Sequence, residues 1–391
     1  MSKSIIESAA HTVGMNKFIV NKKHKYSEFP NSSNSLDTTK MDTAQEIISS
    51  WPEYKFTKLH SLEKIAGWCG IKAVYYKDEA TRFDLGSFKA LGGAYAVSIL
   101  VQELKRKGGS PSNLTVTTAT DGNHGRSVSW GAQLAGCNAK IFIHSNVSSE
   151  RERAMSALGA DVVRVDGNYE ASLAECKKVA SLNNWPIVSD TSWEGYRDIP
   201  LEIMAGYSLM TREILKQMGP DRPTHTFLPI GVGGLAAGVV TPLWQDMQKN
   251  LSKVISVESN LSPCFLKSIE AGEPVLFDIK KETIMAGLSC GEVSDIAWEI
   301  LETTLSHCMS ITDEGIPSSM RLLANGNASE VKIEAGECSA AGVNALLAAR
   351  KDDKIWKDLE LDKNSIVLLI GTEGATDRKI YNELLKVGEN I

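Results

Sequence analysis

Residues 114–143 read LTVTTATDGNHGRSVSWGAQLAGCNAKIFI, and this stretch decides the fold class. The run at 114–118 is rich in branched residues and predicts a strand, and residues 125–134 predict a helix that ends at Gly136. The run at 139–143 predicts the next strand. Two strands joined by a helix lie parallel in one sheet, because a parallel pair needs a long crossover connection.

The same alternation of strand and helix continues along the chain. Residues 149–158 and 169–182 predict two more helices. Further strands are expected at 161–165, 186–188, 226–230, 253–258 and 365–370. We therefore predict an α/β fold made of two doubly wound open-sheet units.

The first 45 residues differ in character from the rest of the chain. They are polar, with the run NSSNS at 31–35, and they predict an extension with little regular structure beyond a short strand at 17–21. We expect a large domain made of 46–108 and 193–391, and a small domain at 109–192.

Composition excludes several classes of protein. The 391 residues are 42% hydrophobic and 23% charged, as in an average globular protein, and their net charge of -6 argues against a nucleic-acid partner. The sequence has no apolar run of membrane-spanning length and no secretory signal near its start. Seven cysteines without CxxC spacing predict reduced thiols in the cytoplasm, and neither they nor the histidines have the spacing of metal ligands.

A glycine-rich turn follows the predicted strand at 226–230. It comprises Gly231, Val232, Gly233, Gly234 and Leu235, and a helix rich in alanine and glycine comes next. Such a turn directs successive N–H groups at one anion, so a phosphate is the expected ligand. A tight turn without a ligand is the alternative. The spacing is not the GxGxxG of a dinucleotide site, and a single phosphate therefore fits better than a pyrophosphate.

Three further segments carry reactive or polar groups. In GSFKALGGAY, at 86–95, Lys89 follows Phe88 in an apolar helix, and a partly buried lysine can form a Schiff base. The turns TDGNHG at 120–125 and GTEGATD at 371–377 each follow a predicted strand, and helix capping is the alternative for each. A Schiff-base lysine, a phosphate loop and two polar turns together describe a site for pyridoxal phosphate (PLP).

These motifs resemble the fold type II PLP-dependent enzymes, a group that includes serine and threonine dehydratases, serine racemase and cysteine synthase. The resemblance extends from about residue 53 to the C-terminus. It implies a fold of the tryptophan synthase β kind, with the active site in the cleft between the two domains. It also implies that Lys89 holds PLP as an internal aldimine and that Phe88 lies at the cofactor. Asn123 would form a hydrogen bond to the cofactor O3′, and the amides of 231–235 would bind its phosphate. Thr372 would lie near the pyridine nitrogen.

Two carboxylates distinguish the chain from the dehydratases. Asp121 stands where those enzymes have a small or hydroxylic residue, and Asp190 begins DTSWEGY at 190–196. An N-cap is the alternative for Asp190. Two acids suit a cationic substrate, or a reaction that needs a base on each face of Cα. The motifs DGNHGR and DTSWEGY resemble diaminopropionate ammonia-lyases.

That resemblance implies a PLP-dependent carbon–nitrogen lyase of amino-acid catabolism, which converts D- and L-2,3-diaminopropionate to pyruvate and ammonia. Asp190 is then the base for the L-isomer and Asp121 the base for the D-isomer, while Thr120, Asn123 and His124 bind the substrate carboxylate. A cytoplasmic homodimer is also implied. A serine or threonine dehydratase, a racemase, or a β-replacing enzyme is the alternative, as is a PLP-binding module without turnover. A disulfide between Cys264 and Cys290 stays open, with free thiols preferred.

Overall fold

The protein divides into two compact units in its structure, a computed structural model that describes residues 2–25 and 36–388. The large unit comprises Met1–Ser35, Phe56–Thr81 and Met210–Ile391, and the small unit comprises Leu36–Lys55 and Arg82–Leu209. The predicted run at 31–35 lies outside the described residues.

A sheet of seven strands forms the centre of the large unit, in the order β1-β9-β8-β7-β10-β3-β2. The five inner strands run parallel, and β1 and β2 pair antiparallel at the two edges. The strands are β1 (Met15–Val20), β2 (Lys58–Ser61), β3 (Ala73–Asp78), β7 (His225–Pro229), β8 (Lys253–Ser259), β9 (Leu305–Ile311) and β10 (Ile366–Gly371). Every residue of β7, β9 and β10 is buried, as expected for parallel strands covered on both faces.

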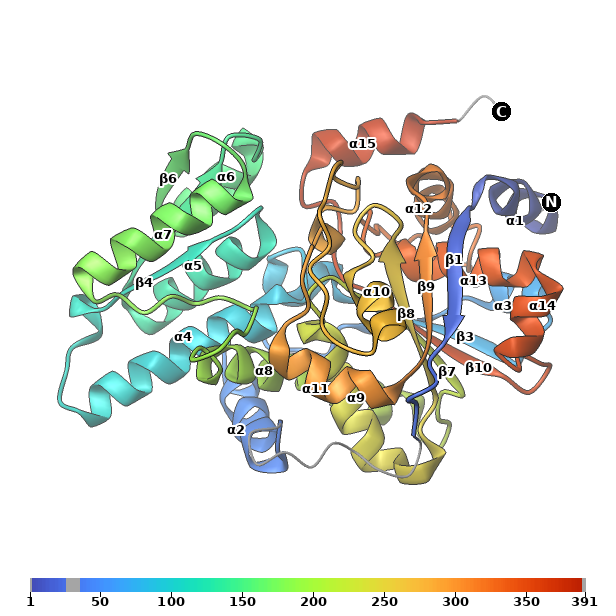
Figure 1. Ribbon diagram of the computed structural model, residues 1–391, viewed down its shortest axis with the longest axis horizontal. Helices are drawn as coiled ribbons and strands as arrows, with labels where there is room; N and C mark the ends of the chain where they lie inside the picture. Colours follow the sequence, from blue (N-terminus) through green and yellow to red (C-terminus); the bar gives the residue numbers. More distant parts are fainter. Residues whose placement is uncertain (1, 26–35, 389–391) are drawn as a thin grey trace. The chain divides into compact units, whose positions relative to one another are not determined.

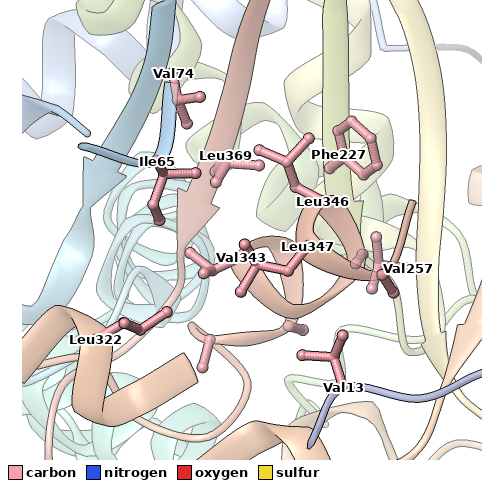
Figure 2. Close-up of a cluster of buried hydrophobic side chains, with 14 of the residues drawn as sticks. Val13, Ile65, Val74, Phe227, Val257, Leu322, Val343, Leu346, Leu347 and Leu369 are labelled. Atoms are coloured by element: carbon pink, nitrogen blue, oxygen red, sulfur yellow. The ribbon is translucent and has the colours of Figure 1, made fainter. Parts of the chain in front are cut away.

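The helices of the large unit include one that packs directly on the sheet, α13 (Ala341–Lys351), which contacts β7, β8, β9 and β10. Figure 2 shows its residues Leu346 and Leu347 in the core with Phe227 and Leu369. Burying one such side chain contributes about 1.5–3 kcal/mol. The remaining α-helices are α1 (Ser2–Thr12), α3 (Glu63–Cys69), α9 (Gly234–Met247), α10 (Cys264–Ala271), α11 (Asp295–Thr304), α12 (Ile316–Ala324), α14 (Asp353–Asp358) and α15 (Arg378–Lys386).

The N-terminal segment is more ordered than we expected. Helix α1 buries Ile6 and Ala9 in the core of the large unit, with Val13 just after its end. Strand β1 then lies beside β9 at the sheet edge (Figure 1). The short strand predicted at 17–21 corresponds to β1, whereas α1 was not predicted. Few residues of α1 are apolar, and of these Ile6 and Ala9 face the core while Ile5 is exposed.

The small unit contains three parallel strands, β4 (Thr115–Ala119), β5 (Asn138–His144) and β6 (Asp161–Val165), in that order. An isolated parallel bridge joins Thr117 of β4 to Ile187, where a fourth strand was predicted. The helices are α2 (Thr38–Ser49), α4 (Lys89–Arg106), α5 (Asn123–Ala135), α6 (Ser149–Ser156) and α7 (Tyr169–Asn183), and α8 (Asp198–Met218) begins in this unit.

Helices cover both faces of this small sheet, in the part of Figure 1 that contains β4, β6 and α7. Phe142 of β5 packs with residues of α7, whereas a Cβ on Gly125 of α5 would meet its neighbour Ile141. Neighbouring residues of a strand point to opposite faces, so α5 and α7 lie on opposite sides. The predicted α/β fold with helices on both faces of a parallel sheet is confirmed.

The boundaries of the small unit differ from the predicted range of 109–192, because α4 joins it. Helix α4 packs closely on α5, where a Cβ on Gly131 would lie 2.6 Å from Cα of Ala94. Trp51, Phe83 and Trp130 also form an aromatic cluster, with ring centroids 4.8–5.7 Å apart. These contacts place residues 36–55 and 82–108 in the small unit. Among the described helices, none is long and apolar enough to cross a membrane.

Candidate active site

Lys89 is the first residue of α4, directly after the positive-φ turn at Gly86. Its Nζ donates a hydrogen bond to Oδ2 of Asp190 and lies 5.3 Å from the centroid of the Phe88 ring. Both side chains of this ion pair are 22% exposed. Both residues were predicted to lie in one site, and within the small unit they are in contact.

The glycine pair after Lys89 lets its helix lie close to two others. A Cβ on Gly92 would come within 2.4 Å of the Tyr207 ring in α8, and one on Gly93 within 2.5 Å of Ser127 Oγ in α5. Ser127 Oγ in turn donates to the Lys89 carbonyl at 2.7 Å and accepts from the Ala94 N–H at 3.0 Å. The start of α4, and with it Lys89, is therefore held firmly.

Asp190 follows the bridge residue Ile187, and Tyr196 secures this segment. The Tyr196 hydroxyl donates to the Ile187 carbonyl at 2.7 Å and accepts from the Ser189 N–H at 2.9 Å. Burial acts to raise the pKa of Asp190, but the Lys89 ammonium overcomes this effect and holds the pKa well below its ordinary value. Asp190 is thus an ionised carboxylate, and it does not cap a helix, since α8 begins only at Asp198.

His124 lies beside this ion pair and is buried. Its Nε2 is 2.7 Å from the Val188 carbonyl, which can only accept, so Nε2 carries the proton. Its Nδ1 lies 4.0 Å from Oδ2 of Asp190 and has no hydrogen-bond partner among the described residues. Burial lowers the pKa of His124, which favours the neutral ring with an Nδ1 that can still accept a hydrogen bond.

Asp121 lies in the turn between β4 and α5 and pairs with a residue that sequence analysis missed. Its Oδ1 is 2.7 Å from Nε2 of His144, the buried last residue of β5. Arg151 of α6 also bonds the Asp121 carbonyl, at 3.1 Å. The Asp121 side chain is 45% exposed, twice the fraction of Asp190.

The turn that holds Asp121 is shaped by Thr120 and Gly122. Thr120 Oγ1 accepts the N–H groups of Gly122 and Gly125, at 3.0 and 3.1 Å. Gly122 is the N-cap of α5 and has a φ of 152°, a backbone conformation that favours glycine. Gly122 has no side chain of its own, and the first-turn N–H of Gly125 is accepted by Thr120, not by Asp121 or Asn123. The alternative of Asp121 or Asn123 as the helix cap was therefore wrong, and Asn123 is instead the first residue of the helix.

In the large unit, the glycine-rich turn runs from the end of β7 into α9. Gly233 is the N-cap of this helix, with a φ of 100° and no side-chain capping bond. A Cβ on Gly233 would lie 2.5 Å from the Phe265 ring, and one on Gly231 would lie 2.9 Å from Cys290 Sγ. The first N–H groups of a helix have no acceptor within it, so the turn keeps donors for an anion.

The turn after β10 contains Thr372, which is buried. Ser339 anchors it: its Oγ lies 3.3 Å from Thr372 Oγ1, donates to the Glu373 carbonyl at 2.6 Å and accepts from the Glu373 N–H at 2.6 Å. Cys264 and Cys290 are not joined by a disulfide, and burial raises the pKa of Cys264 well above its ordinary value. The described residues contain no group of three histidine, cysteine or acidic side chains arranged to hold a metal.

Comparison with known proteins agrees with this arrangement. A family model described as "Pyridoxal-phosphate dependent enzyme" matches residues 51–371. The diaminopropionate ammonia-lyase of Escherichia coli K12 is 36% identical over 354 residues, which are 86% of this chain and 89% of that protein. The chain belongs to the diaminopropionate ammonia-lyase family.

Further members of the diaminopropionate ammonia-lyase family are similar in sequence and in structure. The Salmonella typhimurium protein is 32% identical, over 87% of this chain and 90% of its own. The crystal structure of the holo enzyme from E. coli superposes with a TM-score of 0.89 at 33% identity, over 97% of this chain and 99% of that chain. The predicted fold type, the cofactor PLP and the class of PLP-dependent lyase are thus confirmed at the level of the family.

Each unit, taken by itself, contains groups that suit a part of the cofactor of diaminopropionate ammonia-lyases. An uncapped helix N-terminus with two glycines that exclude any side chain suits the phosphate of PLP. A partly buried lysine beside an aromatic ring suits the Schiff base. His144, Tyr196 and Ser339 are the supporting residues that sequence analysis did not assign. His144 and Ser339 bond partners that are distant in sequence. Tyr196 ends the motif DTSWEGY, but its hydroxyl bonds only backbone groups, and no sequence pattern indicates that role.

Proposed function

We propose that the chain catalyses the elimination of ammonia from D- and L-2,3-diaminopropionate and yields pyruvate. The observation that carries the proposal is the pair of carboxylates in the small unit, each with its own hydrogen-bond partner, Lys89 for Asp190 and His144 for Asp121. A crystal structure of the E. coli relative is described as its complex with an "aminoacrylate-PLP azomethine reaction intermediate", which supports elimination.

We propose that Lys89 and Phe88, Asn123, residues 231–235 and Thr372 hold one PLP molecule. The 231–235 turn supplies N–H donors for the phosphate, and Thr372 supplies a hydroxyl for the pyridine nitrogen. When bound, PLP serves as an electron sink that makes the Cα proton of an amino acid acidic.

In the proposed reaction, one aspartate removes the Cα proton. Asp190 acts on the L-isomer and Asp121 on the D-isomer, because removal from opposite faces of Cα requires two bases. Asp190 is suited to this role because its carboxylate is ionised and lies next to Lys89.

The β-amino group is then lost as ammonia, and Lys89 can supply a proton in this step. The other product, 2-aminoacrylate, takes up water and gives pyruvate and a second ammonia, so one substrate and one water yield one pyruvate and two ammonia. Two carboxylates also suit the cationic β-ammonium group, whereas the neutral hydroxyl of serine would leave a charge unpaired.

We assign binding of the substrate carboxylate to Thr120, Asn123 and His124. Thr120 Oγ1 already accepts two backbone N–H groups, so its hydroxyl proton is the part that can be donated. His124 would bind the carboxylate through its backbone N–H, because its Nε2 proton is directed at the Val188 carbonyl and its neutral Nδ1 can only accept. We also propose that the enzyme is a cytoplasmic homodimer, which sedimentation of the purified protein tests.

The experiment is an absorbance spectrum of the purified protein followed by assays of pyruvate release from each pure isomer. We expect a Schiff-base band that Lys89→Ala removes, and pyruvate from both isomers. Pyruvate from serine or threonine alone would make the chain a dehydratase, and a thiol amino acid formed with added sulfide would indicate β-replacement. A spectrum without the band after PLP is added would contradict the assignment of Lys89.

A further inference from the structure

We propose that His144 is a positioning residue that holds the Asp121 carboxylate in place as the base for the D-isomer. The inference rests on the proposed function and extends it to a residue outside every motif. The starting point is the 2.7 Å distance between His144 Nε2 and Asp121 Oδ1.

The fold brings these two residues together. Strands β4 and β5 are parallel neighbours, with Ala119 opposite Phe142, so their carboxyl ends lie at one edge of the sheet. Asp121 comes two residues after Ala119, and His144 two residues after Phe142. The contact is therefore a direct consequence of strand register, although 23 residues separate the pair in sequence.

The hydrogen bonds of the imidazole identify which nitrogen is the donor. His144 Nδ1 accepts the N–H of Asn146 at 3.3 Å, so this nitrogen carries no proton in that bond. The proton of a neutral ring is then on Nε2, which donates it to Asp121. His144 is thus a neutral donor, and a hydrogen bond to a carboxylate both orients it and stabilises its charge.

The surroundings keep this donor in position. The His144 side chain is only 6% exposed. Arg164 of β6 donates to the carbonyls of His144, Ser145 and Val147, at 2.8–3.2 Å, and fixes the turn after β5. By contrast, the Asp121 side chain is 45% exposed and stands on a turn, so it depends on its partner for a defined orientation.

Asp190 has a different set of partners, which makes the inference testable within one enzyme. Its carboxylate is bonded by Lys89, and the histidine near it, His124, is 4.0 Å away. A change at His144 therefore affects the base for the D-isomer and leaves the partners of the L-isomer base in place. The ratio of D- to L-isomer turnover measures this difference, whereas a general structural fault would lower both.

The experiment compares His144→Leu and His144→Gln with the wild-type holoenzyme. We expect His144→Leu to lower kcat for the D-isomer roughly 10- to 100-fold, as loss of a hydrogen bond to a charged group does, with KM much less affected. His144→Gln keeps an N–H donor and should recover part of this loss. Lys140→Gln is the matched control. Lys140 lies in β5, as His144 does, and the change removes its ion pair with Asp161 of β6, so turnover of both isomers should be unchanged.

A double variant shows whether His144 acts through Asp121. In an Asp121→Asn background, His144→Leu should cause no further loss with the D-isomer, because the group that it positions is gone. Thermal denaturation of each variant reports on folding, and the Gln variant keeps the test available if the Leu variant is unstable.

Two results would overturn the inference by itself: an equal loss with both isomers, or an unchanged D-isomer rate in His144→Leu while Asp121→Asn abolishes it. Failure of the wild-type enzyme to release pyruvate from the D-isomer is a distinct result. It would overturn the proposed function, and this inference with it.

Discussion

The ammonium of Lys89 is hydrogen-bonded to the carboxylate of Asp190, although 101 residues separate them in sequence. The pair joins the start of α4 to the segment after Ile187, and both side chains are only partly exposed. It keeps the acid ionised, with its pKa well below the ordinary value despite burial, which raises it. Two functional groups that belong to separate sequence motifs are therefore electrostatically coupled.

Asp190→Asn should abolish most turnover of the L-isomer and spare that of the D-isomer. The amide cannot accept the Cα proton, and loss of a general base typically lowers the rate about 10²–10⁴-fold. Steady-state kinetics on the pure enantiomers measure both rates in one preparation, with the absorbance band as a control for bound PLP. Equal loss of both activities would contradict the assignment of one acid to each isomer.

Asp121→Asn should have the mirror effect, with the larger loss for the D-isomer. The same enantiomer assays measure it, and the L-isomer rate serves as the internal reference. If the L-isomer rate falls as far as the D-isomer rate, Asp121 serves both isomers and the assignment is wrong.

Gly233→Ala should weaken PLP binding and destabilise the fold by more than about 1 kcal/mol. The residue has a φ of 100°, and its new methyl group would lie 2.5 Å from the Phe265 ring. Urea unfolding and titration with PLP measure the two effects. Gly67→Ala is the matched control: it lies inside α3, where no atom lies within 4 Å of the added Cβ, and should be neutral or stabilising.

Tyr196→Phe should lower stability by about 1–3 kcal/mol, since it leaves the Ser189 N–H and the Ile187 carbonyl without their shared partner. Because these bonds fix the segment that ends at Asp190, turnover of the L-isomer should fall more than that of the D-isomer. Unfolding in urea and the enantiomer assays test the two parts. An L-isomer rate equal to that of the wild type would show that Asp190 is positioned without this hydroxyl.

The contribution of His225 to stability should fall as the pH drops from about 7 towards 4. Burial lowers the pKa of His225 from 6.5 to about 4, so the folded protein binds a proton at this residue only at a lower pH than the unfolded chain does. This contribution is fully present above pH 6.5 and is lost as the pH falls towards 4, with about 2 kcal/mol gone at pH 5. Urea unfolding at several pH values measures it. His225→Gln should flatten the profile, and an unchanged slope would contradict this source.

Several features of the molecule followed from the sequence because they are local. The strand and helix alternation of 114–182 depends on periodicity and on the residues at the joints, and the strand at 161–165 was predicted with the bounds that β6 has. The lysine, the glycine-rich turn and the two acids were found because each stands in a short motif. Their order and spacing also led to the family.

Other features depend on residues that only folding brings together. The apolar residues of α1 are too few to predict a core helix, and their role is visible only where Ile6 and Val13 join residues of other elements. The sequence by itself thus determined where strands and helices occur along the chain and which residues carry reactive groups, because local patterns encode both. The tertiary structure alone decided that Asp121 meets His144 and that Asp190 meets Lys89, because parallel strands and close helix packing set distances that no local pattern contains.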